Sequence, residues 1–187
     1  KHVYPKNFKN FSIPLPTIEV QNQIVEELDS YQKIIDGCNQ VINNYKPSID
    51  TESSWETVEL GKVTELIKRG ITPKYLDNNG TTVLNQRCIR NHSIYYEHSR
   101  QHNHNDKKIS LEKYLQNADV LVNSTGVGTL GRVAQFFGDN NKITVDSHIT
   151  IVRPNKKIFE DYFFGLTMIM IEDQISKSGE GSTGQTE

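Results

Sequence analysis

The sequence is poor in cysteine and has no long hydrophobic run. Its 187 residues include two cysteines, Cys38 and Cys88, and 35% of the chain is hydrophobic. Two cysteines without a spacing pattern exclude a disulfide framework and a cysteine-based zinc site. No apolar run approaches the ~20 residues of a membrane span, and no secretory signal segment is recognisable. We therefore expect a cytoplasmic protein with reduced thiols and no membrane association.

The sequence also lacks the residue patterns of common catalytic sites. It contains no Asn/Asp-Pro-Pro-Tyr motif of adenine methyltransferases, no nuclease-like Asp…Glu-x-Lys in a strand context and no nucleophile elbow. His98, His102 and His104 lie in a polar, asparagine-rich stretch without patterned partners, which favours a solvated loop over a metal site. We predict no catalytic residues, no metal and no cofactor on this chain.

A glycine-rich stretch allows two incompatible interpretations. Gly126, Gly128 and Gly131 spell G-x-G-x-x-G after an apolar run, and Asp146 follows twenty residues after Gly126. This outline of a dinucleotide-binding motif makes a nucleotide-binding oxidoreductase an alternative function. The motif needs a helix of roughly ten residues after its third glycine, whereas only six residues, 132–137, precede the next turn. We therefore favour a strand–turn–strand whose glycines supply positive φ. The stretch also lacks the Lys and Ser/Thr of a P-loop.

Residues 17–47 predict one long helix with an apolar seam. Thr17 is a candidate N-cap, Glu19 lies in the first turn, and Pro47 ends the pattern. Apolar residues recur at alternating spacings of 4 and 3, which indicates a coiled-coil seam over three heptads. The seam consists of Ile24, Leu28, Tyr31, Ile35, Cys38, Ile42 and Tyr45. A passive assembly module that acts through this helix is a second alternative function.

The remaining segments predict an extended start, a linker and a larger α+β domain. Residues 1–16 form an extended segment, residues 48–54 form a polar linker, and residues 55–187 carry short apolar runs between Gly, Asn and Asp turns. We expect a mixed, mainly antiparallel sheet in this domain. The expected strands are 63–67, 81–84, 94–96, 120–122, 133–137 and 144–152, with helices at 110–115 and 158–175.

Positive charge is concentrated in one part of the chain, although the net charge is −2. Residues 62–108 carry nine Lys/Arg against four acids, a balance of +5, whereas residues 17–46 have a balance of −3. Local positive charge favours an anionic partner. Gln and Arg side chains pair with base edges in the major groove, and hydroxyls suit phosphate and sugar oxygens. The candidate DNA-binding residues are Arg69, Thr72, Lys74, Tyr75, Gln86, Arg87, Arg90, Ser124, Thr125, Arg132, Ser182 and Thr183.

Together these motifs resemble the DNA-specificity subunits of type I restriction-modification systems over nearly the whole chain. Residues 11–28, with Phe-Ser-Ile-Pro-Leu-Pro-Thr-Ile-Glu, are similar to the exit from a target-recognition domain into a conserved spacer helix. Residues 55–73, with Arg-Gly-Ile-Thr-Pro, resemble the start of the next recognition domain. Residues 119–134 resemble that domain's glycine-rich strand pair, and residues 181–185 resemble the approach to its end.

The resemblance implies a non-catalytic subunit that recognises double-stranded DNA and docks methyltransferase subunits. Those partners would hold S-adenosylmethionine, and restriction subunits would join the larger assembly. In the family, two recognition domains separated by antiparallel spacer helices each read half of a bipartite site. This chain has one domain and one helix, so it would read one half-site, and an antiparallel homodimer would restore the other half. The resemblance leaves open whether the chain is a fragment, a half-subunit or a rearranged chain.

The resemblance also predicts where residues 1–16 belong. In the family, the Gly-Ser-Thr-Gly-Gln sequence found here at 181–185 is followed shortly by the Ile-Pro-Leu-Pro sequence found here at 13–16. We therefore expect residues 1–16 to complete the recognition domain formed by residues 55–187.

Overall fold

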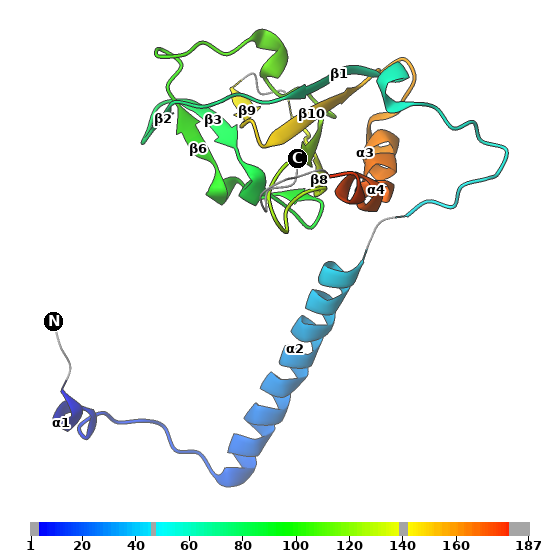
Figure 1. Cartoon of the computed structure of the whole chain (residues 1–187). Coiled ribbons are helices and arrows are strands. Elements are labelled where there is room, and N and C mark those ends of the chain that lie inside the picture. The colour runs from blue at the N-terminus through cyan, green and yellow to red at the C-terminus, as the bar shows by residue number, and fades with distance from the viewer. Residues whose placement is uncertain (1–3, 46–47, 139–141, 180–187) are drawn as a thin grey trace. The chain divides into compact units, whose positions relative to one another are not determined.

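The protein divides into two units in a computed structural model that describes residues 4–45, 48–138 and 142–179 (Figure 1). Unit 1 is Lys1–Tyr45 and unit 2 is Lys46–Glu187. The described part of residues 1–16 is exposed and is grouped with unit 1. Its expected role in completing the recognition domain therefore stays a prediction.

Unit 1 consists of a short helix α1 (Pro5–Phe8) and the long helix α2 (Ile18–Asn44). The predicted long helix is confirmed: α2 has 27 residues and begins after the N-cap Thr17, which gives a length of about 40 Å. Hydrogen bonds from its own backbone N–H and from the Thr17 side chain lower the pKa of Glu19. Tyr45 is the C-cap, with an extended ψ of 123° and a backbone N–H that still donates to the carbonyl of Val41. Its place in the seam stays a prediction.

The described residues of unit 2 form ten short strands and two helices, which confirms the α+β fold with mainly antiparallel pairing. The strands are β1 (Thr64–Arg69), β2 (Tyr75–Leu76), β3 (Thr81–Leu84), β4 (Ile89–Arg90), β5 (Ser93–Ile94), β6 (Arg100–His102), β7 (Val120–Asn123), β8 (Val133–Gln135), β9 (Ile143–Val145) and β10 (Ile149–Pro154). The helices are α3 (Asp161–Met170) and α4 (Glu172–Lys177). Single 3-10 turns lie at Leu60–Lys62, Gln86–Cys88, Tyr96–His98 and Leu111–Lys113.

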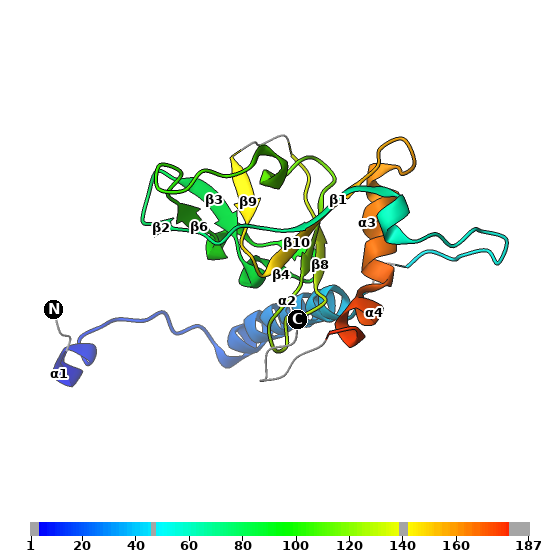
Figure 2. The same ribbon diagram turned by 45° about the horizontal axis from the view of Figure 1, so that its top comes forward.

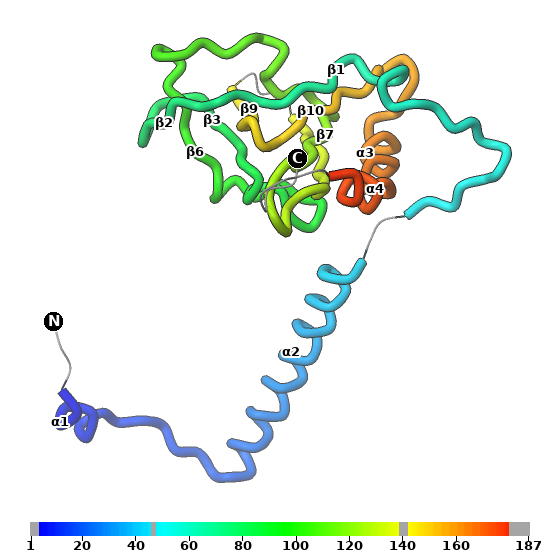
Figure 3. The backbone as a smooth tube through the Cα atoms, in the orientation of Figure 1, coloured from blue at the N-terminus to red at the C-terminus, as the bar shows by residue number. Residues whose placement is uncertain are grey.

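Two four-stranded sheets form the body of unit 2. The first has the order β1-β10-β7-β8 and is antiparallel throughout. The second has the order β2-β6-β3-β9, with β3 and β9 parallel. β4 and β5 pair as a separate hairpin. The tube in Figure 3 shows how β10 runs between β1 and β7.

The first sheet is buried on both faces because successive side chains of a strand point to opposite sides. Leu121 and Ile151 face the core shared with the second sheet, which also contains Leu84 of β3 and Val145 of β9. The alternate residues of the same strands form a second core with Phe164, Met168 and Ile169 of α3. Figure 2 shows α3 beside the first sheet and the second sheet on the other side.

The expected single strand at 144–152 is wrong, because the chain turns in its middle. Asp146 makes the turn: its carboxylate accepts a hydrogen bond from the backbone N–H of His148 at 2.9 Å, and its carbonyl accepts from Ile149. β9 before the turn belongs to the second sheet, and β10 after it belongs to the first. A regular alternation of apolar residues therefore spans two strands that pack in different sheets.

The helices expected at 158–175 and 110–115 are also shorter than predicted. The first begins only at Asp161, because the Glu160 carboxylate caps the backbone N–H of Phe163, and it breaks at Ile171 into α3 and α4. Between 110 and 115 the structure has one 3-10 turn. The side-chain cap at Glu160 therefore sets the start of α3, whereas neither α4 nor the 3-10 turn has a side-chain cap.

His102 contradicts the expected solvated loop. It lies in β6 and is fully buried. Its Nδ1 accepts a hydrogen bond from the backbone N–H of Lys74 at 2.9 Å, and its Nε2 is 2.7 Å from the carbonyl oxygen of Lys107. The imidazole therefore ties two loops to the second sheet and has a structural role.

Candidate functional site

The ends of four chain segments meet at one edge of unit 2. The backbone N–H of Gly70, just after β1, donates to Ile149, and the N–H of Ser124, just after β7, donates to His148; both bonds are 2.9 Å long. The N–H of Asp146 donates to Leu84 at the end of β3, also at 2.9 Å. Polar residues that follow β1, β3, β7 and β9 are therefore neighbours. We call the surface that they form the strand-end surface.

Gly70 is required for this convergence. A Cβ atom at this position would lie 2.1 Å from the carbonyl oxygen of Val145, which is main chain and cannot move aside. The missing side chain lets β1 approach the β9–β10 turn closely enough for Ile71 to form a parallel bridge with Asp146.

A polar cleft of about 450 Å³ occupies one part of the strand-end surface. Its charged and aromatic groups come from the second sheet, from the turn after β3, from the 3-10 turn Tyr96–His98 and from the turn at Asp146. The guanidinium carbon of Arg100 lies 3.4 Å from the centroid of the Tyr75 ring, a cation–π contact that orients both side chains. The cleft is lined by Tyr75, Asn85, Gln86, Arg87, Glu97, His98, Arg100 and Asp146.

The turn that carries Gln86 and Arg87 is fixed by Asn85. The Asn85 carboxamide oxygen accepts from the backbone N–H of Arg87 at 2.9 Å, and its Nδ2 donates to the carbonyl of His98 at 2.6 Å. An Asn at this N-cap position is favourable because its short side chain satisfies exposed backbone donors. The arrangement presents two consecutive side chains, a carboxamide and a guanidinium, at the mouth of the cleft.

The glycine-rich stretch forms the turn between β7 and β8 and borders the cleft. Gly126, Gly128 and Gly131 have φ of 103°, 75° and 85°, which confirms the predicted strand–turn–strand. The dinucleotide-binding interpretation is wrong, because the third glycine leads into the antiparallel strand β8 and not into a helix. Thr129 of this turn donates to Gln86 Oε1 at 3.1 Å, so the turn supports the cleft directly.

A second part of the strand-end surface carries hydroxyl groups beside Arg69. The hydroxyls of Ser124 and Thr150 contact each other, and Thr125 Oγ1 lies 2.6 Å from Nδ1 of His148. Arg69, Ser124 and Thr150 also line an apolar pocket of about 290 Å³ between the first sheet and the C-terminal helices. Basic and hydroxyl side chains of this kind suit the oxygens of a sugar-phosphate backbone.

Burial raises the pKa of two groups in the cleft. It raises the pKa of Asp146, and the hydrogen bond from the His148 backbone only partly offsets this effect. Burial and the Asp146 carboxylate also raise the pKa of Tyr75, so its phenol keeps its proton at neutral pH. The cleft therefore combines two guanidinium groups, a phenol donor and the two carboxyl groups of Glu97 and Asp146, which can recognise hydrogen-bonding groups as well as charge.

The family model for the type I restriction modification DNA specificity domain matches residues 52–187, which is most of the chain and all of the α+β unit except its first residues. The chain belongs to this family.

A solved structure shows the same fold, and a second one aligns over a similar length. The HsdS subunit from Thermoanaerobacter tengcongensis aligns with a TM-score of 0.50 and 17% identity, over 92% of this chain and 46% of that chain. A chain from a structure concerned with the complex assembly and conformational transition of the type I R-M system aligns with a TM-score of 0.49 and 18% identity, over 94% and 47% respectively. The chain thus spans about half the length of each of these two solved chains. No curated protein sequence matches it.

The specificity domain gathers half of the predicted DNA-binding residues on its strand-end surface. Tyr75, Gln86 and Arg87 line the cleft, and Arg69 and Ser124 line the neighbouring pocket. Thr125 is 9% exposed and bonded to His148, so it supports the surface from below. That any of these residues contacts DNA stays a prediction.

The other predicted residues are placed differently. Thr72 and Lys74 lie on the exposed connection to β2, beside the cleft residue Tyr75. Arg132 donates to the carbonyl of Gly128 at 2.8 Å and so braces the glycine turn. Arg90 is exposed in the β4–β5 hairpin, which forms a small sheet of its own. Ser182 and Thr183 lie outside the described residues.

Sequence reasoning missed three groups of the strand-end surface. Arg100 was counted only in the local charge balance, although it stacks on Tyr75. His148 and Thr150 were assigned to the middle of a strand and are placed on this surface by the turn at Asp146. Asp-Ser-His in the middle of an alternating run was a signal for this turn, because Asp often hydrogen-bonds the backbone two residues later.

Within the described ranges no group of three or more His, Cys, Asp or Glu residues is arranged to hold a metal ion. No helix in the described part is long and apolar enough to cross a membrane.

Proposed function

We propose that this specificity domain reads one half of a bipartite double-stranded DNA site through its strand-end surface. The observation that carries the proposal is that Gln86 and Arg87 of the polar cleft and Arg69 and Ser124 of the neighbouring pocket come from separate chain segments whose ends are joined by hydrogen bonds. Groups that fit phosphates lie beside groups that fit base edges, which is the combination that sequence-specific binding needs.

The chain acts in this proposal as a non-catalytic subunit. Methyltransferase subunits supply the methylation chemistry and hold S-adenosylmethionine, and restriction subunits join the larger assembly in the cytoplasm. The family membership supports these partners. Within the described part the cleft contains no nucleophile paired with a base, and its one buried carboxylate serves the turn at Asp146.

Helix α2 is the surface that we propose for assembly. The seam residues Ile24, Leu28, Tyr31, Ile35 and Ile42 are each about half exposed or more. Ile34 and Val41, which the sequence analysis did not include, are also exposed and lie one position before Ile35 and Ile42. The apolar stripe is therefore wider than a two-stranded seam, and it fits packing against more than one partner helix.

A selection from randomised DNA duplexes tests the proposal. The chain is assembled with its methyltransferase subunits, and we expect one defined half-site to be enriched. The Arg69→Glu, Arg87→Glu double variant should bind this site at least about tenfold more weakly. The negative slope of log affinity against log salt should also become less steep by about 2. Lys157→Glu is the control, because Lys157 is an exposed residue after β10 outside the strand-end surface.

Two results would contradict the proposal. The absence of any enriched sequence with the wild-type complex would exclude sequence-specific reading. Wild-type affinity and salt slope in the Arg69→Glu, Arg87→Glu variant would instead favour the passive module, in which α2 recruits partners while the α+β unit does not contact DNA.

A further inference from the structure

Gln86 is held in the cleft through both its backbone and its side chain. Its backbone carbonyl accepts a hydrogen bond from Asn123 Nδ2 at 3.0 Å, and its turn is fixed by the Asn85 cap. Its side-chain Oε1 accepts from the Thr129 hydroxyl at 3.1 Å. Backbone and side chain are therefore both restrained before any ligand binds, which reduces the entropy lost on binding.

The glycine turn packs against the Gln86 side chain so closely that a side chain at position 126 would not fit. A Cβ atom on Gly126 would lie 2.4 Å from Gln86 Oε1 and 2.4 Å from Thr129 Oγ1. The positive φ of Gly126 and the packing of Gln86 against it thus depend on each other. The third residue of the arrangement, Asn123, is fully buried, and among the described residues its Oδ1 is the one buried side-chain polar atom without a partner.

These contacts give the carboxamide of Gln86 a defined polarity. Oε1 lies 3.1 Å from the Thr129 hydroxyl, whose single proton is shared with the carbonyls of Thr125 and Gly126 at 3.2 and 3.3 Å. Nε2 has no hydrogen-bond partner among the described residues. Nε2 is also not a buried unpartnered atom, so it is open to solvent at the cleft. The side chain therefore presents N–H donors, while its acceptor atom is used within the protein.

We propose that Gln86 determines specificity at one base pair by donating to a keto oxygen, O6 of guanine or O4 of thymine, in the major groove. This proposal rests on DNA reading by the strand-end surface. At that place in the groove guanine and thymine present acceptors, whereas adenine and cytosine present amino donors. An exposed N–H donor can therefore bond to the keto oxygen of guanine or thymine. Opposite adenine or cytosine it would face another donor, and neither group would be satisfied. Thr129 is the positioning residue that fixes which end of the carboxamide faces the DNA.

The test compares the enriched sequences of four Gln86 and Thr129 variants in the complex with methyltransferase subunits. Gln86→Met keeps the length of the side chain and removes its N–H donors. The base preference at one base pair of the enriched motif should then fall roughly tenfold, while the preferences at the other positions stay unchanged. Gln86→Glu replaces the donors by acceptors and should shift the preference there to adenine or cytosine on the same strand. Thr129→Val should remove the discrimination between bases with a keto oxygen and bases with an amino group at this position. Thr129→Ser keeps the hydroxyl and should retain the wild-type preference.

Gln116→Ala serves as the matched control, because Gln116 is an exposed glutamine away from the cleft. An unchanged motif in Gln86→Met and Gln86→Glu would overturn the proposal and leave DNA reading by the surface intact. A uniform loss of affinity without a change in motif would also overturn it, since Gln86 would then be a general contact. If the wild-type complex enriched no sequence, the proposed function itself would fail.

Discussion

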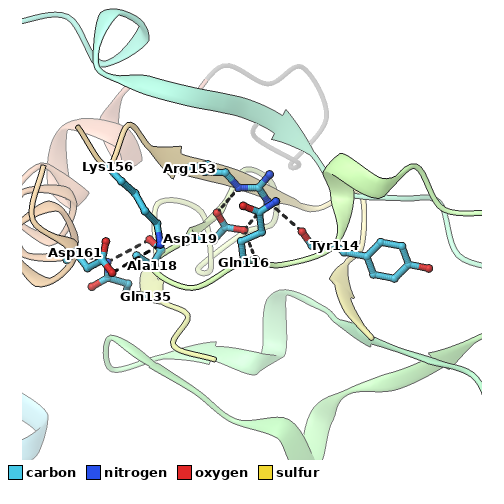
Figure 4. A network of polar contacts seen from close by, with 8 residues as sticks. All are labelled: Tyr114, Gln116, Ala118, Asp119, Gln135, Arg153, Lys156 and Asp161. Atoms are coloured by element: carbon cyan, nitrogen blue, oxygen red, sulfur yellow. Dashed lines mark hydrogen bonds and ion pairs between the residues drawn. The ribbon is translucent and has the colours of Figure 1, made fainter. Parts of the chain in front are cut away.

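At the scale of single residues, the best-defined interaction in the core is the pair of Asp119 and Arg153 (Figure 4). Two parallel hydrogen bonds of 2.8 Å join them, and their side chains are 0% and 7% exposed. Arg153 also donates to the carbonyl of Tyr114, and Asp119 accepts from the backbone of Gln116. The pair links β10 to the start of β7 and so fixes the sheet that leads to the strand-end surface.

Removing one partner of this pair should be costly, because the other charge stays buried. We expect Asp119→Ala to lower the free energy of unfolding by about 3–5 kcal/mol, measured by urea denaturation. Lys62→Ala is the control, since Lys62 and Glu59 form an ion pair in which both side chains are more than 70% exposed. That control should change the stability by less than about 1 kcal/mol. A similarly small loss in Asp119→Ala would show that water reaches Arg153.

Asp146 should make the stability depend on pH. Because burial raises its pKa in the folded state, the folded protein holds this proton more tightly than the unfolded chain does. The resulting stability is fully present below the ordinary carboxyl pKa of about 4 and is lost as the pH rises through the raised pKa. Asp146→Asn keeps an acceptor for the His148 N–H and removes the titration. As the pH rises through this range, the free energy of unfolding of Asp146→Asn should increase relative to that of the wild type. Above the raised pKa the difference should stay constant.

The titration of Asp119 does not disturb this comparison of Asp146→Asn with the wild type. Burial also raises the pKa of Asp119 despite its bonds to Arg153, but this contribution is common to both proteins and cancels in their difference. A stability difference that is constant with pH, measured by thermal unfolding at several pH values, would contradict the argument for Asp146.

At the scale of elements, the sequence predicts those parts whose pattern is local and long. α2 follows from an unbroken heptad pattern with a cap, and β3 and β7 follow from apolar runs between turns. β2, β4 and β6 have two or three residues each, and such short strands show no periodicity. They form because strands elsewhere in the sequence pair with them, as β2 and β3 do with β6.

The candidate site is predictable in composition but not in arrangement. Arg, Gln and hydroxyl side chains in a basic region identify the kind of partner. Which of them meet depends on the turn at Asp146, which moves His148 and Thr150 next to the end of β7. Arg90 and Arg132 have the same chemistry as Arg87, yet one lies in a separate hairpin and the other braces a turn. Only tertiary pairing separates these cases.

The glycine turn between β7 and β8 offers a direct test of the element that supports the cleft. A Cβ atom on Gly131 would lie 2.7 Å from the Cβ of Ser176 in α4, and its φ is 85°. Gly128 has a φ of 75° but open space around it. Both alanine variants carry backbone strain of about 1 kcal/mol, and only Gly131→Ala also displaces α4. We expect Gly131→Ala to lower the melting temperature by several degrees more than Gly128→Ala. Equal shifts would show that α4 moves without cost.

At the scale of the whole molecule, charge and apolar surface are divided between the two units. The basic stretch lies in the α+β unit that carries the strand-end surface, while the helix has an acidic balance and an exposed apolar stripe. A specificity domain that binds DNA with one unit and protein with the other would need this division. Long-range attraction to DNA would then act on the reading surface and not on the helix that must find its partner.

The last prediction is that α2 pairs two copies of the chain in an antiparallel arrangement. Burying six seam side chains at ~1.5–3 kcal/mol each offsets an association cost of about 4–15 kcal/mol. A closed two-fold pair places one α+β unit at each end, and a two-fold protein matches an interrupted palindrome. Light scattering at roughly tens of micromolar protein, a concentration suited to dissociation constants of this order, should give the mass of a dimer. Leu28→Asp and Ile35→Asp should give monomers, whereas Gln40→Asp, at an exposed position opposite the seam, should stay dimeric. A monomeric wild type with the same mass as Leu28→Asp would exclude the homodimer, and α2 would then be left for a helix of a different subunit.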